Sequence, residues 1–548
     1  MGRLERVRVA VVGAGPTGLT MLKALREDGF SVTLYERRHN VGGLWAFSED
    51  PVYTSALPVT RANLSKFTCG FSDFPLPDKY PNYMRPHEFQ EYQQAFATHF
   101  DLLRDIVFGA SVKQVRRNAD DNGWLVDIEK DGKTETSGFD RIAICNGYQT
   151  KANIPIFEGQ GLFTGQIIHS QAFKDPEPLR GKKVVVVGLS STAGDIIPAL
   201  MPVASRVYVS HRRGATPFKR YHKGTPADLA ITWRRRQMSQ ILQRYTPNLA
   251  RWVSDKAVGF MARRAWGKLD PAWRLEPFPS ITLTLPGSFE LVMPLLQDGS
   301  LTSLHGLTRF VGPKAVEFAD GTVVDDVDAV VLCTGYSADF SITPQAVVET
   351  SKPPDAKYNG PPLPRLYLNL FPPAYADSCV LLSYCAFGKN NGFSFADITA
   401  WAVSSVWRGI EPLPARADME KHIDAHQRWI ASRRAIDPAC DVSAVKQWEF
   451  QQWLHKAAGT GMAENLSLFT WKGWKFWWAD RKLFNLMNHG VETAHAFRVF
   501  KTGRRKTWAG ARDAIIHANE VVSKTFPMKE DEIPWPPRVS ERVEAKVV

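Results

Sequence analysis

Two apolar runs, each followed by a glycine turn and a helical pattern, organise the 548-residue chain. Residues 7–12 read VRVAVV and residues 183–187 read KVVVV, which is the length and polarity of a strand covered on both faces. After the first run, MLKALREDG places apolar residues at helical spacing. Strands alternating with helices in this way predict an α/β fold with parallel sheets.

The first turn has the spacing G-x-G-x-x-G, with Gly13, Gly15 and Gly18 in the three slots. These glycines allow a tight turn, close approach of backbone amides to a pyrophosphate, and close packing of the helix on the strand. The next strand pattern, SVTLYE, ends at Glu36, whose carboxylate suits the hydroxyls of an adenosine ribose. Strand, glycines, helix, strand and acid in this order predict a dinucleotide site.

The second turn is an altered copy, in which Gly188, Ser190 and Ala193 occupy the glycine slots. The ribose acid is absent, and Arg212 and Arg213 follow the next strand pattern instead. Their guanidinium groups suit a 2′-phosphate, so this unit is expected to bind NADP rather than NAD. The alternative is a degenerate relic of the fold, because the Ser190 side chain lies where backbone should approach phosphate.

Two such units in one chain imply two dinucleotides, FAD held in the first and NADPH exchanging in the second, with hydride passing from nicotinamide to flavin. We therefore expect two Rossmann-like domains, the NADPH domain being inserted into the FAD domain. The expected boundaries are 1–160 and 326–527 for the FAD domain, 161–325 for the NADPH domain and 528–548 for a flexible tail.

Positive charge is concentrated in one segment of the chain. The net charge is +12, and residues 211–270 hold fourteen Lys and Arg against three Asp. Within this basic helical insertion, at about 215–270, two segments carry apolar residues at helical spacing. The insertion is expected either to touch a membrane surface or the substrate entrance, or to pack one face on the domain with the other solvated. We expect no nucleic-acid binding, since no motif supports it.

Other features exclude several classes of protein. The cysteines form no C-x-x-C pair and no zinc spacing, and no apolar run reaches about 18 residues, so disulfide chemistry, a metal site and a spanning helix are not expected. The chain is expected to be cytoplasmic, or peripheral to a membrane. The aromatic segment 469–478, FTWKGWKFWW, is expected to pack as a core contact rather than to lie in a membrane interface.

Several motifs together resemble one family. Residues 163–173, FTGQIIHSQAF, fit the pattern F-x-G-x-x-x-H-x-x-x-[FY] just ahead of the second glycine turn. GGLW at 42–45, NLSK followed by FSDFPLP, and EFADGT followed by VVLCTGY match further segments. The chain thereby resembles the flavin-containing monooxygenases, which are class B flavoprotein monooxygenases, over roughly residues 5–520.

The resemblance implies roles for individual residues. Asn63 falls where the family keeps an active-site asparagine near the flavin C4a position, although a turn residue is the alternative interpretation. The resemblance places Gly43, Leu44 and Trp45 beside the isoalloxazine, and Gly188, Ser190, Ser191, Thr192, Arg212 and Arg213 around NADP. His169 is expected to be structural rather than a proton-transferring base.

The reaction that the resemblance implies uses NADPH and O2. Reduced FAD would add O2 at C4a, and the C4a-hydroperoxyflavin would oxygenate an amine nitrogen or a thioether sulfur of a small molecule. A Baeyer-Villiger monooxygenase acting on a ketone is the nearest alternative. A catalytically degenerate flavoprotein is the non-enzymatic one. Substrate identity and oligomeric state are left open.

Overall fold

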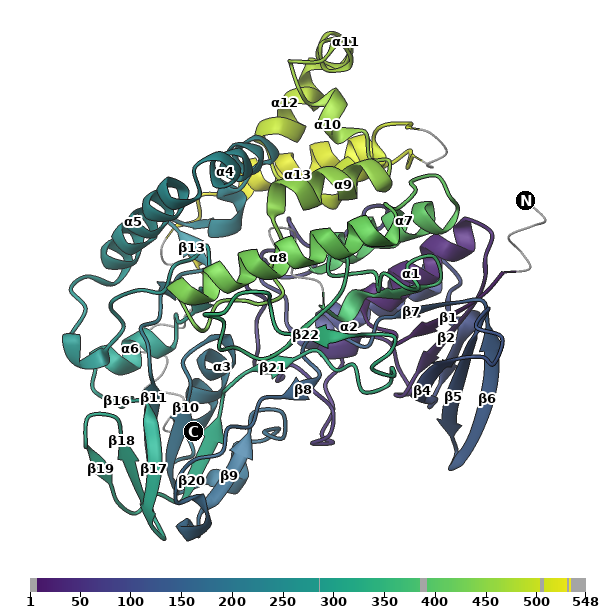
Figure 1. Cartoon of the computed structure of the whole chain (residues 1–548). Helices are drawn as coiled ribbons and strands as arrows, with labels where there is room; N and C mark the ends of the chain where they lie inside the picture. The colour runs from purple at the N-terminus through teal and green to yellow at the C-terminus, as the bar shows by residue number, and fades with distance from the viewer. Residues whose placement is uncertain (1–6, 285, 385–391, 503–506, 530–531, 534–548) are drawn as a thin grey trace.

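The computed structural model places two parallel sheets side by side under a layer of helices (Figure 1). The structure describes residues 7–284, 286–384, 392–502, 507–529 and 532–533. The first sheet has the strand order β24-β7-β1-β2-β3, and all its pairs are parallel. Its strands are β1 (Arg8–Val12), β2 (Ser31–Glu36), β3 (Ile106–Phe108), β7 (Arg141–Ile144) and β24 (Cys379–Leu381).

The second sheet has the order β16-β11-β10-β20-β9, again with parallel pairs throughout. Its strands are β9 (Gln166–His169), β10 (Lys183–Val187), β11 (Arg206–His211), β16 (Leu301–His305) and β20 (Ala329–Leu332). Since β7 precedes this sheet in the chain and β24 follows it, the second domain is inserted into the first. This confirms the expected α/β fold of two Rossmann-like domains, whereas the domain boundaries remain a prediction.

In both parallel sheets an aspartate fixes the return strand against the first strand. The Asp140 carboxylate, just before β7, accepts from the backbone amide of Arg8 at 2.7 Å. Asp328, just before β20, accepts from the backbone amide of Lys183 at 3.0 Å. One side chain thus registers the return strand against the first strand in each domain. A two-stranded ribbon of β8 (Lys151–Ala152) and β21 (Tyr336–Ser337) connects the domains.

Smaller antiparallel sheets lie beside each parallel one. The first domain carries β4 (Ser111–Arg117), β5 (Trp124–Lys130) and β6 (Lys133–Phe139), and the second carries β17 (Leu307–Gly312), β18 (Ala315–Phe318) and β19 (Val323–Val324). Short pairs are made by β12 (Pro217–Phe218), β13 (Tyr221–His222), β14 (Thr225–Pro226), β15 (Gly287–Ser288), β22 (Thr350–Ser351) and β23 (Leu363–Pro364).

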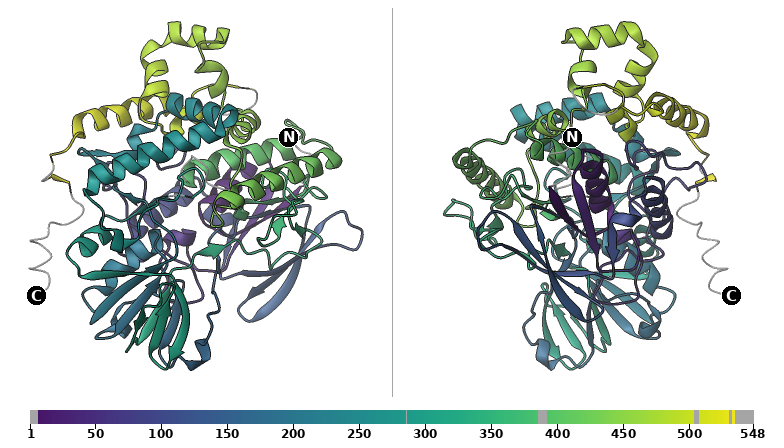
Figure 2. Two further views of the ribbon diagram at one scale, coloured as in Figure 1. Left: turned by 60° about the vertical axis from the view of Figure 1, so that its left-hand side comes forward. Right: turned by 90° about the vertical axis from the view of Figure 1, so that its right-hand side faces the viewer.

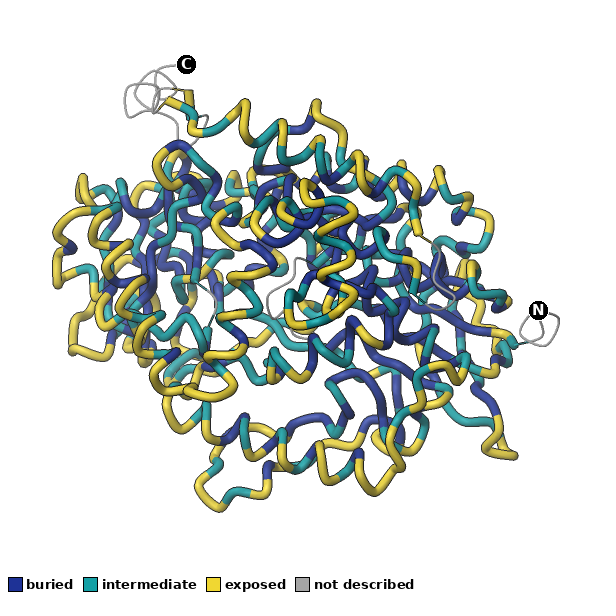
Figure 3. The backbone as a smooth tube through the Cα atoms, turned by 90° about the horizontal axis from the view of Figure 1, so that it is seen from above, coloured by how far each residue is buried: buried dark blue, intermediate teal, exposed yellow. Residues whose placement is uncertain are grey.

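Helix α1 (Pro16–Glu27) is buried from Gly18 to Leu25 because α7 (Gly392–Trp407) covers it away from the sheet. The buried residues concentrate in the interior of the molecule, and the exposed residues at its periphery (Figure 3). The remaining helices are α2 (Pro86–His99), α3 (Ser191–Leu200), α4 (Trp233–Tyr245), α5 (Pro247–Trp266), α6 (Val292–Gln297), α8 (Arg416–Ile436), α9 (Gln447–Ala457), α10 (Met462–Asn465), α11 (Trp471–Ala479), α12 (Arg481–His489) and α13 (Ala511–Thr525).

The prediction for the aromatic segment 469–478 is wrong in part. Phe476 packs on Phe484 and Phe500, with ring centroids 5.9 and 4.9 Å apart. Phe469 and Trp471, however, are 99% and 81% exposed. Trp471 begins α11 and Phe469 lies two residues before it, and this helix projects from the body of the molecule in both views of Figure 2. Aromatic content alone could not reveal that this helix has only one covered face.

The remaining predictions concern the basic insertion, the cysteines, the C-terminal tail and membrane-spanning helices. Both helical segments of the basic insertion are helices, α4 and α5. Cys69, Cys145, Cys333, Cys379 and Cys440 are free, and Cys385 lies outside the described residues. Most of the predicted tail also lies outside them, although Met528 donates its amide to the Gly224 carbonyl at 2.9 Å. Among the described helices, none combines the length and apolar character needed to cross a membrane.

Candidate active site

A cavity of about 1070 Å³ opens between the first glycine turn and the helical layer. This exceeds the roughly 300–1,000 Å³ typical of small-molecule sites, so the space suits a large ligand or a ligand with a second molecule beside it. One end is lined by the turn and the end of β2, and the other by α4, α5 and the segment that leads into α9. The lining includes Gly13, Gly15, Glu36, Gly43, Leu44, Trp45 and Asn63.

The first turn has the geometry that its glycines predict. Gly13 has φ +98°, and a Cβ there would lie 2.7 Å from the Cys145 carbonyl oxygen. A Cβ on Gly18 would lie 1.7 Å from the Gly13 carbonyl oxygen, so only glycine lets α1 sit this close to β1. The loop is narrow because the strand, the turn and the helix are all in backbone contact.

Glu36 is buried at the end of β2 beside this turn. One carboxylate oxygen accepts from the Ala14 amide at 2.6 Å, and the other accepts from the Arg38 amide at 2.9 Å. Each oxygen has a further lone pair, which leaves capacity for the hydroxyls of a ribose in the cavity. The residue is thus fixed in place before any ligand binds.

The GGLW segment forms a short 3₁₀ turn, Gly43–Trp45, against the first glycine turn. A Cβ on Gly43 would lie 2.9 Å from the Gly15 Cα. The Arg38 guanidinium donates to the carbonyl oxygens of Gly43, Ala46 and Thr54 at 3.0, 2.7 and 3.1 Å. Sequence analysis missed Arg38. Residues 36–38 read ERR, and three consecutive charged residues do not indicate that one of the arginines turns inward.

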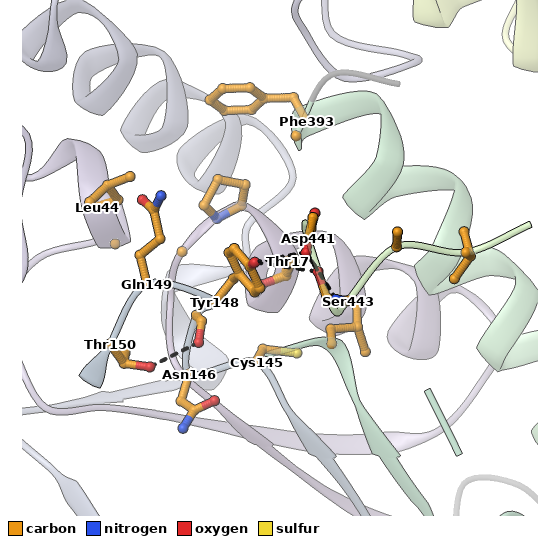
Figure 4. Close-up of a pocket in the computed structure, with 18 of the residues that line it drawn as sticks. Thr17, Leu44, Cys145, Asn146, Tyr148, Gln149, Thr150, Phe393, Asp441 and Ser443 are labelled. Carbon is orange, nitrogen blue, oxygen red and sulfur yellow. Dashed lines mark hydrogen bonds between the residues drawn. The ribbon is translucent and has the colours of Figure 1, made fainter. Parts of the chain in front are cut away.

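Residues 145–150 form the floor of the cavity and come directly after β7 (Figure 4). The Tyr148 hydroxyl lies 3.3 Å from Ser443 Oγ and 3.4 Å from Asp441 Oδ1, on the segment before α9. Burial raises the pKa of Tyr148 to about 12, so the phenol stays neutral and can donate. These contacts close the floor against the helical layer.

Asn63 lies at the rim, where the two domains meet. Its amide nitrogen is 3.5 Å from Ser191 Oγ in the first turn of α3. Its amide oxygen accepts from Arg220 Nη2 at 3.2 Å. The side chain is therefore held between the cavity of the first domain and the helix N-terminus of the second.

Arg220 is the residue that fixes this arrangement, and sequence analysis missed it. Its guanidinium pairs with Glu290 at 2.8 Å, and the two side chains are only 7% and 2% exposed. The same guanidinium donates to the carbonyl oxygens of Ala62 and Arg61, at 2.8 and 3.0 Å. Arg220 lies between β12 and β13 of the inserted domain, so one buried cation ties both domains to the loop that carries Asn63.

A second buried acid holds the same loop. One Asp228 oxygen accepts from the Ser65 amide at 3.1 Å and from the Ser65 and Thr68 hydroxyls at 2.7 Å each. Asp228 belongs to the segment that the charge pattern describes only as basic. Its role depends on a contact across 160 or more positions, which no local pattern reports.

Ser190 does not disturb the backbone conformation of the second glycine turn. Ser190 has φ −146° at the start of α3, which is extended backbone open to any residue, and its side chain is exposed. Gly188 keeps the strained position, with φ +102° and a Cβ that would lie 2.4 Å from the Cys333 carbonyl oxygen. The turn therefore retains the shape of the first one, and its amides remain at the N-terminus of α3.

The two arginines that follow β11 lie at the protein surface. Arg212 and Arg213 are both exposed, and Arg213 pairs with Asp437 at the end of α8 at 2.6 Å. The preceding His211 is buried, with Nδ1 placed to donate to the Arg213 carbonyl at 2.7 Å and Nε2 2.9 Å from Ser303 Oγ. Burial lowers the pKa of His211, so the imidazole is neutral. This strand end thus presents the guanidinium groups of Arg212 and Arg213 to a ligand, and the Asp437 carboxylate lies beside the second of them.

Taken together, the residues present fit two dinucleotides. The cavity holds the narrow glycine turn, the oriented Glu36 and the GGLW turn within one continuous surface. The second turn has an intact backbone and exposed cations at the end of the following strand.

His169, which was expected to be structural, lies on β9 with Nε2 3.2 Å from the Gly335 carbonyl.

Asp195 on α3 provides a pH-dependent prediction. Burial raises the pKa of this carboxyl to about 6, although the Thr60 hydroxyl donates to it at 2.8 Å. The folded state therefore holds the proton more tightly than the unfolded one, and the free energy of unfolding decreases as pH rises from about 4 to about 6. We expect Asp195→Asn to raise that free energy by about 2 kcal/mol at pH 7.5, measured by urea denaturation.

This gain should shrink as the pH approaches 4, and a gain that does not depend on pH would contradict the assignment. The exposed Asp120→Asn variant is the control, and its free energy of unfolding should stay within about 0.5 kcal/mol of wild type at every pH.

Arg220 gives a second prediction. Arg220→Met leaves the Glu290 carboxylate buried without its cation, so we expect a loss of about 3–5 kcal/mol in the free energy of unfolding. Adding Glu290→Leu should recover more than half of that loss, because the uncompensated charge is removed. Chemical denaturation of both variants measures this. A double variant no more stable than Arg220→Met would show that the backbone carbonyls, rather than the ion pair, dominate.

Comparisons with known proteins agree with this geometry. The monooxygenase aurF of Gibberella zeae is 35% identical over 518 residues, covering 93% of this chain and 97% of that protein. Flavin-containing monooxygenase 5 of Cavia porcellus is 29% identical over 545 residues, covering 96% and 95%.

Solved structures show the same fold. The S-allyl-L-cysteine S-oxygenase of Allium sativum superposes with a TM-score of 0.62 at 20% identity, covering 94% of this chain and 98% of that one. An oxidized steroid monooxygenase bound to NADP gives 0.57 at 19% identity, covering 83% and 98%. The family model described as flavin-binding monooxygenase-like matches residues 6–547. The chain belongs to the flavin-binding monooxygenase-like family.

Proposed function

We propose that this flavin monooxygenase uses NADPH and O2 to oxygenate an amine nitrogen or a thioether sulfur of a small molecule. The observation that carries the proposal is the position of Asn63, between the flavin-side cavity and the N-terminus of α3. An amide fixed there can donate to a group that both domains contact. Such a donor in a desolvated site stabilises developing negative charge far more than it would in water.

FAD, when bound, accepts electrons from NADPH and activates O2 for transfer to the substrate. Its pyrophosphate would lie on the Gly13–Gly15 backbone, its ribose at Glu36, and its ring beside Gly43, Leu44 and Trp45. NADP would lie on the Gly188–Thr192 turn, with Arg212 and Arg213 at the 2′-phosphate. In this arrangement Ser191 and Asn63 are the residues between the two dinucleotides.

The chain's own contribution is positioning and the exclusion of water. Arg220 and Asp228 hold the Asn63 loop rigidly, so the amide needs no reorganisation when charge develops beside it. The Tyr148 contacts close the floor of the cavity, and α4, α8 and the start of α9 supply the far wall. A dry cavity limits the release of hydrogen peroxide, which is the wasteful alternative to substrate oxygenation.

Soft nucleophiles fit the far end of the cavity. Leu283, Trp429 and Val445 line it together with polar and charged residues of α4, α8 and α9. Phe89 and Phe393 lie instead at the GGLW end, where Phe89 packs on Trp45 with ring centroids 4.4 Å apart. Walls that combine apolar side chains with polar groups can hold and orient a small amine or thioether. One of the structural neighbours is an S-allyl-L-cysteine S-oxygenase, which makes thioethers the first class to test.

The direct test is to load the full-length protein with FAD and measure NADPH oxidation, O2 uptake and product formation with a thioether, a tertiary amine and a cyclic ketone. We expect S-oxide or N-oxide in near-equal amount to the NADPH consumed. Lactone or ester as the sole product would replace the proposal with Baeyer-Villiger oxidation. Bound FAD that NADPH cannot reduce would identify a degenerate flavoprotein.

Asn63→Asp sharpens this test, because it keeps an acceptor for Arg220 and loses the amide donor. We expect product formation to fall by about 100-fold, with hydrogen peroxide taking a larger share of the NADPH consumed. Unchanged product yield would remove Asn63 from the proposed mechanism.

The coenzyme preference gives a separate prediction. Arg212→Ser removes one guanidinium from the proposed 2′-phosphate site, so KM for NADPH should rise about 10-fold while KM for NADH stays constant. Arg234→Ser, which removes an exposed arginine from α4, is the matched control and should change neither. An equal rise for both coenzymes in Arg212→Ser would place this residue away from the 2′-phosphate.

A further inference from the structure

The far end of the active-site cavity contains an arginine without a carboxylate partner. Arg433 lies in the last turn of α8 and lines the cavity together with Trp429, one helical turn before it. Its guanidinium carbon lies 4.7 Å from the centroid of the Trp429 ring. Among the described residues, no carboxylate oxygen lies within 4 Å of a guanidinium nitrogen of Arg433. A half-buried cation without a counter-ion calls for an explanation.

The hydrogen bonds of Arg433 leave part of its guanidinium for a further acceptor. Nη2 donates to the Thr282 carbonyl at 2.8 Å, which is the one acceptor that this group reaches among the described residues. Nε is enclosed by the protein without a partner, whereas Nη1 is not among the enclosed atoms. Because a guanidinium carries five N–H donors, Nη1 and the second N–H of Nη2 remain for a molecule in the cavity.

The charges at this end of the cavity do not balance. The cations are Arg244, Arg433 and Lys446, and the carboxylates are Asp441 and Glu449. Asp441 accepts from the amide and the hydroxyl of one serine, at 2.9 and 2.7 Å. Glu449 lies 3.5 Å from Arg244. Arg433 and Lys446 thus supply positive charge that no described carboxylate within 4 Å compensates.

A structural role explains only part of this arrangement. The C-terminal end of α8 favours a cation, and the bond to Thr282 ties α8 to the second domain. Neither contact requires the guanidinium to line the cavity. The next residue shows the difference, because Arg434 is also half-buried but lies over Tyr358, at 5.8 Å, and does not line the cavity.

We infer that Arg433 binds a carboxylate of the substrate, so that the cavity selects small molecules with a soft nucleophilic atom at one end and an acidic group at the other. A guanidinium pairs with a carboxylate through two parallel hydrogen bonds, which gives both affinity and orientation. Trp429, Leu283 and Val445 would contact the apolar body of such a molecule. This inference rests on the proposed function, because it names the substrate class of the same cavity.

A pair of substrates that differ only in charge tests the inference. We would compare 4-(methylthio)benzoate with its methyl ester, which keeps the same ring and sulfur, and measure sulfoxide formation by the FAD-loaded protein. In the wild type we expect KM for the acid to be at least about 10-fold below KM for the ester. A KM for the acid equal to or above that for the ester overturns the inference, and this result needs no variant.

Variants of Arg433 locate the preference. Arg433→Gln should raise KM for the acid about 10- to 100-fold and leave KM for the ester unchanged, because only the charged interaction is lost. Arg433→Lys keeps the positive charge and should have a smaller effect, about 3-fold to 10-fold. A rise in KM for both substrates by the same factor would show that Arg433 only supports the fold of the cavity, which also overturns the inference.

The adjacent arginine provides the matched control. Arg434→Gln removes a half-buried guanidinium from the same turn of α8, and it should leave KM for the acid at the wild-type value. KM for NADPH should stay constant in all these variants. A rise in KM for NADPH in Arg433→Gln, with KM for the acid unchanged, would assign Arg433 to the coenzyme instead.

Isothermal titration calorimetry separates this inference from the proposed reaction, because binding needs no turnover. Titrating 4-(methylthio)benzoate into the FAD-loaded protein with NADP should give an affinity that falls at least about 10-fold in Arg433→Gln and stays constant in Arg434→Gln. Arg433-dependent binding of the acid without any sulfoxide product would support the assignment of Arg433 and reject the proposed function. Equal oxygenation of acid and ester would support the proposed function and reject the carboxylate site.

Discussion

The buried Arg220 guanidinium is the contact on which the site depends. It neutralises Glu290 within its own domain, and its remaining donors satisfy the backbone and side chain of residues 61–63 in the other domain. A charge so deeply buried persists only where its partners are complete. The relative position of the two domains at the cavity rim is therefore set by electrostatics and hydrogen bonding, and Asn63 is the residue placed by that constraint.

Much of the fold could be predicted because its determinants are local. Gly13, Gly18 and Gly188 occupy positions where a Cβ would overlap backbone, and a strand followed by a helix leaves few other solutions. Glu36 follows from the same logic. Gly18 and Glu36 contact the Gly13 carbonyl and the Ala14 amide within the same unit, and spacing reports such neighbours directly. Gly13 and Gly188 are recognised by the same spacing, although the backbone that their Cβ atoms would meet belongs to Cys145 and Cys333.

What could not be predicted depends on distant partners. Arg220 and Asp228 look like parts of a charged insertion until the structure places Asn63 and Ser65 against them, about 160 positions away. The aromatic segment around α11 was assigned to the core on composition, whereas the fold covers Phe476 and Trp477 and leaves Trp471, Trp474 and Trp478 exposed. Ser190 was suspected of spoiling the second turn, and its extended backbone and exposed side chain explain why it does not.

The insertion of one domain into the other affects how the chain can be made. Helix α1 is synthesised almost at once, but α7, which covers it, follows only after the whole second domain, and β24 completes the first sheet just before that. Until the ribosome has passed Trp407, the apolar residues of α1 have no permanent cover, so a nascent chain exposes them for most of its synthesis. The second domain, whose strands all lie between Gln166 and Leu332, can assemble earlier. The apolar residues of α1 therefore wait longer for their cover than those of the second domain.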